Sequence, residues 1–190
     1  MNIEYEVKFL AIEQAEMQKK LKAIGAELRH EKTMMRRLVY ENLLNKSSYL
    51  RLRDEGHKVT LTYKEVVATD HIEGVKEIEV QISDFESMKL MISKLGMNMK
   101  SYQETYRETR FKDGIQITID ERPGLRPFIE IEAESEEKVK EFSQLLGFDY
   151  EKGVFGTVSD IYLLELGIKP DVINYMPKIT FEEPPQLYIS

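Results

Sequence analysis

Ile3–Lys8, with the sequence I-E-Y-E-V-K, is the stretch from which the fold of this chain can be worked out. In a β-strand the side chains alternate between two faces, so Glu4, Glu6 and Lys8 share one face and the three apolar residues share the other. A surface strand with a solvated outer face has the same pattern. From this stretch alone the charged face could therefore be turned either to solvent or toward a shared cavity. The rest of the chain decides between them.

The Glu-x-Glu pattern of this strand occurs twice more, as Glu77/Glu79 in K-E-I-E-V-Q-I and as Glu130/Glu132 in P-F-I-E-I-E-A. Each copy alternates with apolar residues and leads into an amphipathic segment with helical spacing that ends near a glycine. The sequence therefore predicts three strand-then-helix units. We expect the helices to pack on the apolar strand faces and the carboxylates to gather on the opposite surface.

Further strands are expected over 33–40, 49–53, 58–64, 102–112 and 115–122, and the last two are joined by Asp113-Gly114, a strong hairpin signal. Thr157 and Asp160 form a pattern like a capping box and predict a last helix. Strands in antiparallel hairpins with separate helices indicate the α+β class. We expect one domain over residues 1–190, with 170–190 as an extended tail packed on it.

Composition narrows the function classes. A net charge of −7 disfavours general nucleic-acid binding, although a local basic patch can still bind a small polyanion. The absence of cysteine excludes disulfides and thiolate metal sites and fits a reducing cytoplasm. No apolar run approaches the length of about 18 residues that a membrane span needs, and no signal peptide is visible. We therefore expect a cytoplasmic protein without a membrane partner.

Basic residues share the surface of the carboxylates by the same alternation. Arg51 and Arg53 lie opposite leucines, Lys64 lies opposite Leu61, and Asp120 falls on the same face of its own strand. Many charges on a concave surface are costly without a bound partner. Oxygen ligands suit Mg²⁺ or Mn²⁺, while arginine and lysine suit phosphate oxygens. The pattern predicts a site for a phosphate chain.

The same motifs occur in a fixed order along the chain. They are E-x-E-x-K at 4–8, L-R-L-R at 50–53, the lysine of T-Y-K at 64, E-I-E at 77–79, and I-D-x-x-P-G-x-x-x-F-x-E-I-E at 119–132. With this ordered set the chain resembles the CYTH superfamily, the triphosphate tunnel metalloenzymes. The resemblance implies an eight-stranded antiparallel β-barrel with amphipathic helices on its outside, whose tunnel binds a small-molecule triphosphate with Mg²⁺ or Mn²⁺.

The resemblance also implies roles for individual residues. Expected metal ligands are Glu4, Glu6, Glu130 and Glu132, with Asp120, Glu77 and Glu79 as further candidates. Expected phosphate-binding and catalytic residues are Lys8, Arg51, Arg53 and Lys64, and Arg107 and Arg110 are further candidates for phosphate binding. The last two have opposite parity on one strand, so the sequence does not say which faces the tunnel. The chain also departs from the family at Tyr106, which stands where a lysine is usual, and at 36–40, where many members carry D-x-Y-F.

The activity stays open between three alternatives. Hydrolysis of an inorganic or organic triphosphate is favoured, because no nucleoside-specific pocket is visible. The second alternative is a class IV adenylyl cyclase that converts ATP to cyclic AMP and pyrophosphate. The third is a module that binds polyphosphate or a nucleotide without turnover. A homodimer also remains open.

Overall fold

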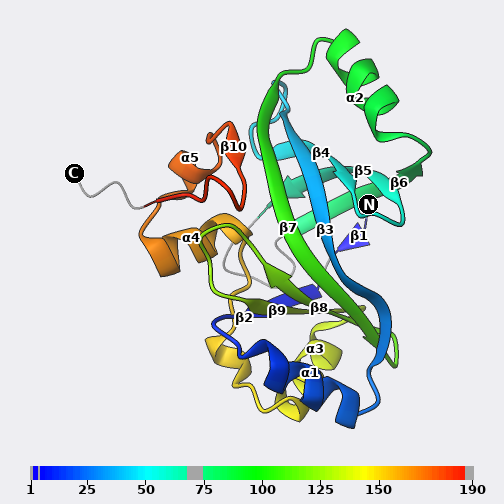
Figure 1. Cartoon of the computed structure of the whole chain (residues 1–190), viewed down its shortest axis with the longest axis vertical. Coiled ribbons are helices and arrows are strands. Elements are labelled where there is room, and N and C mark those ends of the chain that lie inside the picture. Colours follow the sequence, from blue (N-terminus) through cyan, green and yellow to red (C-terminus); the bar gives the residue numbers. More distant parts are fainter. Residues whose placement is uncertain (1, 4, 68–74, 187–190) are drawn as a thin grey trace.

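The computed structural model of this 190-residue chain describes residues 2–3, 5–67 and 75–186. One curled sheet dominates it, with helices on the outside (Figure 1). The strands are β1 (Asn2–Ile3), β2 (Tyr5–Phe9), β3 (Glu27–Glu41), β4 (Ser48–Asp54), β5 (Val59–Val66), β6 (Val75–Ile82), β7 (Met99–Lys112), β8 (Ile115–Glu121), β9 (Phe128–Ala133) and β10 (Lys178–Ile179). The helices are α1 (Gln14–Ala23), α2 (Phe85–Lys94), α3 (Glu136–Leu145), α4 (Val158–Leu166), α5 (Pro170–Ile173) and a 3₁₀ turn at Tyr150–Lys152.

The sheet order is β1-β6-β5-β4-β3-β7-β8-β9-β2, and all these neighbours are antiparallel. β1 and β2 stand at the two ends of this order but are separated in sequence only by residue 4. Counted as two parts of one N-terminal strand, they join the two edges of an eight-stranded sheet. The sequence prediction of an antiparallel barrel-like sheet with outer helices is confirmed.

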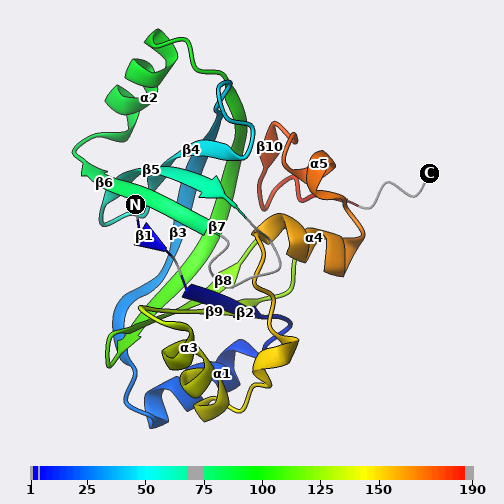
Figure 2. The ribbon, with the colours of Figure 1, turned by 180° about the vertical axis from the view of Figure 1, so that it is seen from behind.

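The lower part of the molecule holds the larger core, where α1 and α3 cover the outer face of β2, β8 and β9 (Figures 1 and 2). Val7, Ile129 and Ile131 are fully buried there, and so is Leu21 of α1. These are apolar positions of two Glu-x-Glu strands, which therefore turn Glu6, Glu130 and Glu132 to the inner face, as predicted.

The third Glu-x-Glu strand, β6, differs from the prediction. Its apolar residues Ile78 and Val80 remain 52% and 51% exposed. The helix that follows, α2, packs instead on the β4 side, where Phe85 and Ile92 join Leu52 in a second core. The helix therefore contacts only the end of β6, at Ile82, and leaves Ile78 and Val80 exposed.

Several boundaries follow the local sequence signals. Asp113 and Gly114 both have positive φ, 50° and 82°, as the tight β7–β8 hairpin requires. Thr157 and Asp160 form a reciprocal capping box at the start of α4. β3 begins at Glu27 rather than at the expected residue 33, so this strand is longer than predicted.

The expected tail carries regular structure, because α5 forms and β10 pairs in parallel with β7 through Lys178 and Ile179. In the part of the chain that the structure describes, none of the helices is long and apolar enough to cross a bilayer.

Candidate active site

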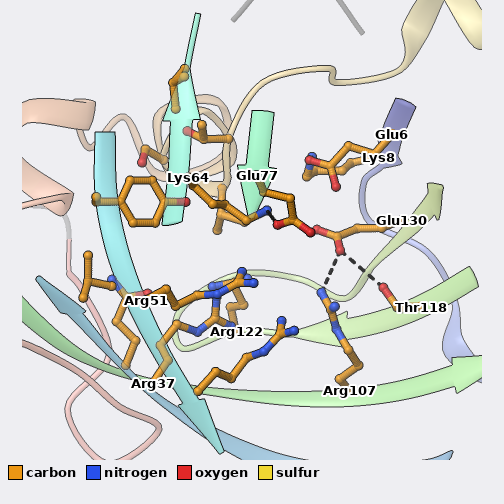
Figure 3. A pocket seen from close by; sticks show the side chains of 18 of the residues that line it. Glu6, Lys8, Arg37, Arg51, Lys64, Glu77, Arg107, Thr118, Arg122 and Glu130 are labelled. Atoms are coloured by element: carbon orange, nitrogen blue, oxygen red, sulfur yellow. Dashed lines mark hydrogen bonds and ion pairs between the residues drawn. The ribbon is translucent and has the colours of Figure 1, made fainter. Parts of the chain in front are cut away.

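A cavity of about 960 Å³ lies on the inner face of the curled sheet, between the strands and the α4–α5 segment. Strand alternation sends charged side chains into it from several strands, and Figure 3 shows arginines on one side facing glutamates on the other. The predicted site residues that line it are Glu6, Lys8, Arg51, Arg53, Lys64, Glu77, Glu79, Arg107, Glu130 and Glu132.

The acidic wall is built by β2 and β9, which pair so that Glu6 lies opposite Glu132 and Lys8 lies opposite Glu130. Directly opposed residues have Cβ atoms about 5 Å apart, so both acidic side chains of the first pair reach the same space. Gln116 Nε2 donates to Glu132 Oε2 at 2.9 Å. The wall therefore presents three carboxylates with one lysine among them.

Lys8 is only 2% exposed and is held at both sides. Its Nζ donates to Glu6 Oε1 at 2.7 Å and to the carbonyl oxygen of Gly156 at 2.9 Å. Burial would lower the pKa of Lys8, but the charges of Glu6 and Glu130 outweigh it and raise the pKa above its usual value. Lys8 therefore stays charged next to the carboxylates.

Arg107 of β7 links Asp120 of β8 to Glu130 of the acidic wall. Its Nε donates to Asp120 Oδ1 and its Nη2 to Glu130 Oε2, each at 2.6 Å, and a further bond joins Nη2 to Asp120. Asp120 is fully buried behind it. Burial would raise the pKa of Glu130, but Arg107 and Lys8 hold it well below its usual range. Glu130 is therefore an anion at neutral pH.

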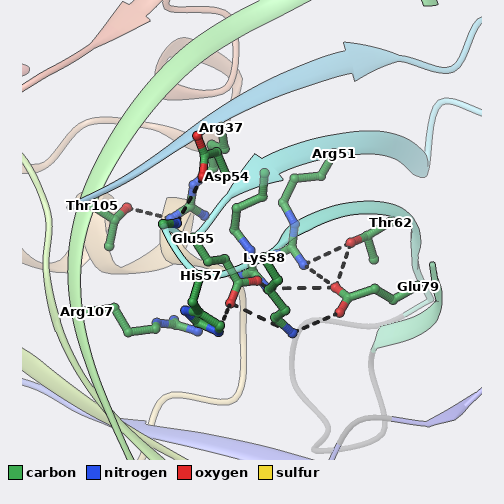
Figure 4. Close-up of polar contacts among 12 residues, drawn as sticks. Arg37, Arg51, Asp54, Glu55, His57, Lys58, Thr62, Glu79, Thr105 and Arg107 are labelled. Carbon is green, nitrogen blue, oxygen red and sulfur yellow. Dashed lines mark hydrogen bonds and ion pairs between the residues drawn. The ribbon is translucent and has the colours of Figure 1, made fainter. Parts of the chain in front are cut away.

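The basic wall comes from the β4–β5 hairpin (Figure 4). Arg51 Nη2 donates to Thr62 Oγ1 at 3.2 Å and lies 3.5 Å from Glu79 Oε2. Arg53 Nη2 lies 2.5 Å from Glu55 Oε1 and 3.7 Å from Glu79. Burial, followed by the neighbouring Arg51, lowers the pKa of Arg53 to about 10. Burial is therefore the main cost of keeping Arg53 charged.

Lys64 and Glu77 complete this side as a cross-strand pair between β5 and β6, with Nζ 3.1 Å from Oε2. Arg53 and Arg51 share Glu79 with Lys58, whose Nζ is 3.6 Å from Oε1. Each of these cations already has an acidic partner that an incoming anion would have to replace.

Two predicted residues are not among those that line the cavity, and a third cannot be placed. Arg110 Nε donates to Glu108 Oε1 at 2.6 Å and its Nη1 to the Ala26 carbonyl at 3.3 Å, on the other face of β7. Of the two arginines with opposite parity, Arg107 is thus the one that faces the cavity, and Arg110 is removed from the candidate set. Asp120 does not line the cavity; it is buried and accepts hydrogen bonds from Arg107. Glu4 lies outside the described residues.

Two buried arginines of the cavity, Arg37 and Arg122, are absent from the sequence prediction. Arg37 Nη2 donates to Thr105 Oγ1, and the Nε atoms of both arginines have no hydrogen-bond partner in the described chain. Burial and then the charge of Arg122 lower the pKa of Arg37 well below its usual value. Arg122 continues the alternation of Gln116, Thr118 and Asp120, so the sequence could have placed it on the inner face. Nothing in the sequence said whether Arg36 or Arg37 faces inward.

The donor set fits a hard divalent cation in its chemistry. Glu6, Glu130 and Glu132 offer carboxylate oxygens on neighbouring positions of two paired strands, which is the ligand type of Mg²⁺ and Mn²⁺. Among residues 2–3, 5–67 and 75–186, however, no three acidic or histidine side chains already stand in a metal-binding arrangement. Glu6 and Glu130 contact Lys8 and Arg107 instead.

Comparisons with known proteins agree with this geometry. A protein of Methanocaldococcus jannaschii, MJ0240, named as a candidate adenylate cyclase, is 30% identical over 135 residues, which cover 68% of this chain and 76% of that protein. The solved PH1819 protein of Pyrococcus horikoshii OT3 is 25% identical with a TM-score of 0.68 and covers 85% of this chain and 99% of its own.

A structure from Vibrio parahaemolyticus, titled as a candidate adenylate cyclase, has the same fold with a TM-score of 0.72 at 15% identity, covering 84% of this chain and 97% of its own. The model of the CYTH domain family matches residues 2–157, which include every strand of the curled sheet except β10. The chain therefore belongs to the CYTH domain family.

Proposed function

We propose that this protein is a metal-dependent enzyme that hydrolyses a triphosphate inside the charged cavity. One observation carries the proposal: a wall of carboxylates and a wall of arginines face each other across a single cavity of about 960 Å³ (Figure 3). A phosphate chain with a divalent cation is the ligand that matches both walls together. A neutral ligand would match neither wall, and a simple cation would match only the carboxylates.

The basic wall binds the phosphate oxygens in this proposal. Arg51, Arg53 and Lys64 project from neighbouring strands and now contact Glu79, Glu55 and Glu77. A phosphate chain offers several acceptor oxygens, and a guanidinium can take two of them at once. Exchange of carboxylate for phosphate oxygens places the chain along β4 and β5. These cations then stabilise the charge that develops during phosphoryl transfer.

The acidic wall holds the cation, with Glu6, Glu130 and Glu132 as the residues that would bind it. Bound Mg²⁺ or Mn²⁺ supplies charge neutralisation and alignment of the phosphate chain. Lys8, fixed by the Gly156 carbonyl, stays beside these carboxylates as a positive charge that reaches the same phosphate oxygens. Arg107 keeps Glu130 ionised and therefore ready to accept a cation.

Cyclisation is the second candidate, because the relative that is 30% identical is named as a candidate adenylate cyclase. Both reactions use the same metal-binding and phosphate-binding residues and differ in the nucleophile. Water yields a shortened phosphate chain plus orthophosphate. A ribose 3′-hydroxyl that attacks the α-phosphorus of ATP yields cyclic AMP and pyrophosphate.

Product profiling tests the proposal. The protein is incubated with tripolyphosphate, thiamine triphosphate or ATP, each with Mg²⁺ or Mn²⁺, while orthophosphate and cyclic AMP are measured. Orthophosphate release that disappears with EDTA supports hydrolysis. Formation of cyclic AMP from ATP would instead identify the activity as cyclisation. Tight binding without turnover of any substrate would reduce the site to a binding module.

Arg53→Gln and Arg36→Gln form a matched pair of variants for this assay. Arg53 belongs to the basic wall, whereas Arg36 points to the outer face and contacts Asp54 and Glu86 at 3.2 and 3.4 Å. Loss of turnover in the first variant only is the expected result. Equal loss in both would show that the effect does not come from the cavity.

A further inference from the structure

Arg37 and Arg122 differ from the other buried cations of the cavity. Lys8, Arg51, Arg53 and Lys64 each have a carboxylate within 4 Å. Neither Arg37 nor Arg122 has an acidic partner among the residues that the structure describes, although they are only 6% and 7% exposed. The balance of charge in the cavity is therefore uneven, with an excess of positive charge at this pair.

The two guanidinium groups are also incompletely hydrogen-bonded. Arg37 has one side-chain partner, the hydroxyl of Thr105, and its Nε has none. The buried Nε of Arg122 likewise has no partner in the described chain, and the same is true of Arg51 and Arg53, so it is the missing carboxylate that sets this pair apart. A buried cation without a counter-ion and without full hydrogen bonding is costly, so such a pair is retained at a cost in stability.

Neighbouring groups hold this pair of arginines in place at the cavity wall. Figure 3 shows Arg37 and Arg122 on the arginine side of the cavity, and Arg122 is near enough to Glu130 to help lower the pKa of that carboxyl. Tyr162 of α4, which also lines the cavity, donates its hydroxyl to the Pro123 carbonyl at 2.9 Å and so fixes the backbone directly after Arg122. The first turn of α4, from Thr157 onward, lines the same cavity, and its positive helix end favours anions, although the Asp160 carboxylate already accepts the Thr157 N–H there.

We propose that Arg37 and Arg122, beside the first turn of α4, form a separate anion subsite that binds one further phosphoryl group beyond the three held by the carboxylate-paired cations. The inference rests on the proposed function and narrows its substrate class. The cavity, at about 960 Å³, is near the upper end of the roughly 300–1,000 Å³ typical of small-molecule sites, so a longer phosphate chain fits. The further group is either the fourth phosphate of a chain or a separate orthophosphate.

Binding of tripolyphosphate and of tetrapolyphosphate, measured by calorimetry with Mg²⁺ present, tests the subsite. The variants are Arg37→Gln, Arg122→Gln and the double variant, with Arg36→Gln as the outward-facing control. Because a hydrogen-bonded charge is removed, each variant should weaken tetrapolyphosphate binding by about tenfold or more and tripolyphosphate binding by less than about threefold. The control should change neither.

A second arm distinguishes the two sources of the phosphoryl group. If orthophosphate fills the subsite, it should raise the melting temperature of the wild type in the presence of tripolyphosphate and should not do so in the double variant. Without any anion, the double variant should melt no lower than the wild type, because it loses two uncompensated buried charges; this also shows that it folds.

Three results would overturn the inference. Equal weakening of both chains would make the two arginines part of the triphosphate site itself, and unchanged binding of both would leave them without a ligand role. A double variant that melts well below the wild type would contradict the uncompensated charge. These outcomes leave the proposed function intact, whereas a wild-type protein that binds neither chain overturns both proposals.

Discussion

Replacing Arg107 by glutamine removes the guanidinium that holds the buried Asp120 and the partly buried Glu130. Three bonds are lost, two to Asp120 and one to Glu130, and Asp120 is fully buried. Removal of one partner from a buried ion pair typically costs about 3–5 kcal/mol of unfolding free energy. A domain is stable by only about 5–15 kcal/mol, so the loss is a large fraction of the total.

Urea unfolding at pH 7, followed by circular dichroism, measures this loss. The double variant Arg107→Gln/Asp120→Asn should recover part of it, because the neutral amide needs no counter-charge. Arg36→Gln, which breaks only a half-exposed pair, should cost no more than about 1 kcal/mol. A loss below about 1 kcal/mol for Arg107→Gln, or two effects that simply add, would refute the account of this cluster.

The pH dependence of the same variant follows from Glu130. Its pKa is depressed in the folded state, so its contribution to stability is present above the unfolded value of about 4.3 and is lost as the pH falls toward the folded value. Without Arg107 the folded pKa should rise toward that of the unfolded chain. Acid unfolding curves of the variant should therefore show a smaller contribution from this group, and identical curves would contradict the reasoning.

Three shorter predictions concern other parts of the molecule. Glu132→Gln should abolish metal-dependent turnover with an unchanged circular dichroism spectrum, and full activity would remove Glu132 as a ligand. The pKa of Lys8 is raised by Glu6, so the stability from this pair is complete below about pH 10.4 and is lost as the pH rises further; a thermal melting series at alkaline pH measures this. A Cβ at Gly153 would lie 2.2 Å from the Val7 side chain, so Gly153→Ala should lower the unfolding free energy by about 1–3 kcal/mol, and an unchanged urea midpoint would contradict this packing.

Strand alternation is sufficient to predict most of the cavity. Wherever a strand has one apolar face, as around Val7 and Ile131, the core fixes which side chains turn inward, and the charged residues of the same strand follow. This is why the alternation of residue types alone places Glu6, Lys8 and Glu130 on one surface.

The prediction failed where alternation was absent or interrupted. Arg36 and Arg37 are adjacent, so composition alone could not say which one faces inward, and the register of β3 shifts between Leu28 and Thr33. Pairing with β4 and β7 decides it. The exposed face of β6 escaped prediction for a different reason: its alternation is regular, but α2 packs mainly on the β4 side of the sheet.

A crystal structure with Mn²⁺ and tripolyphosphate bound tests the central claim most directly. Anomalous scattering should place Mn²⁺ among Glu6, Glu130 and Glu132, with the phosphate chain lying along Arg51 and Arg53. A metal peak outside the cavity, or a phosphate chain bound elsewhere on the protein while the cavity remains as it is, would contradict it.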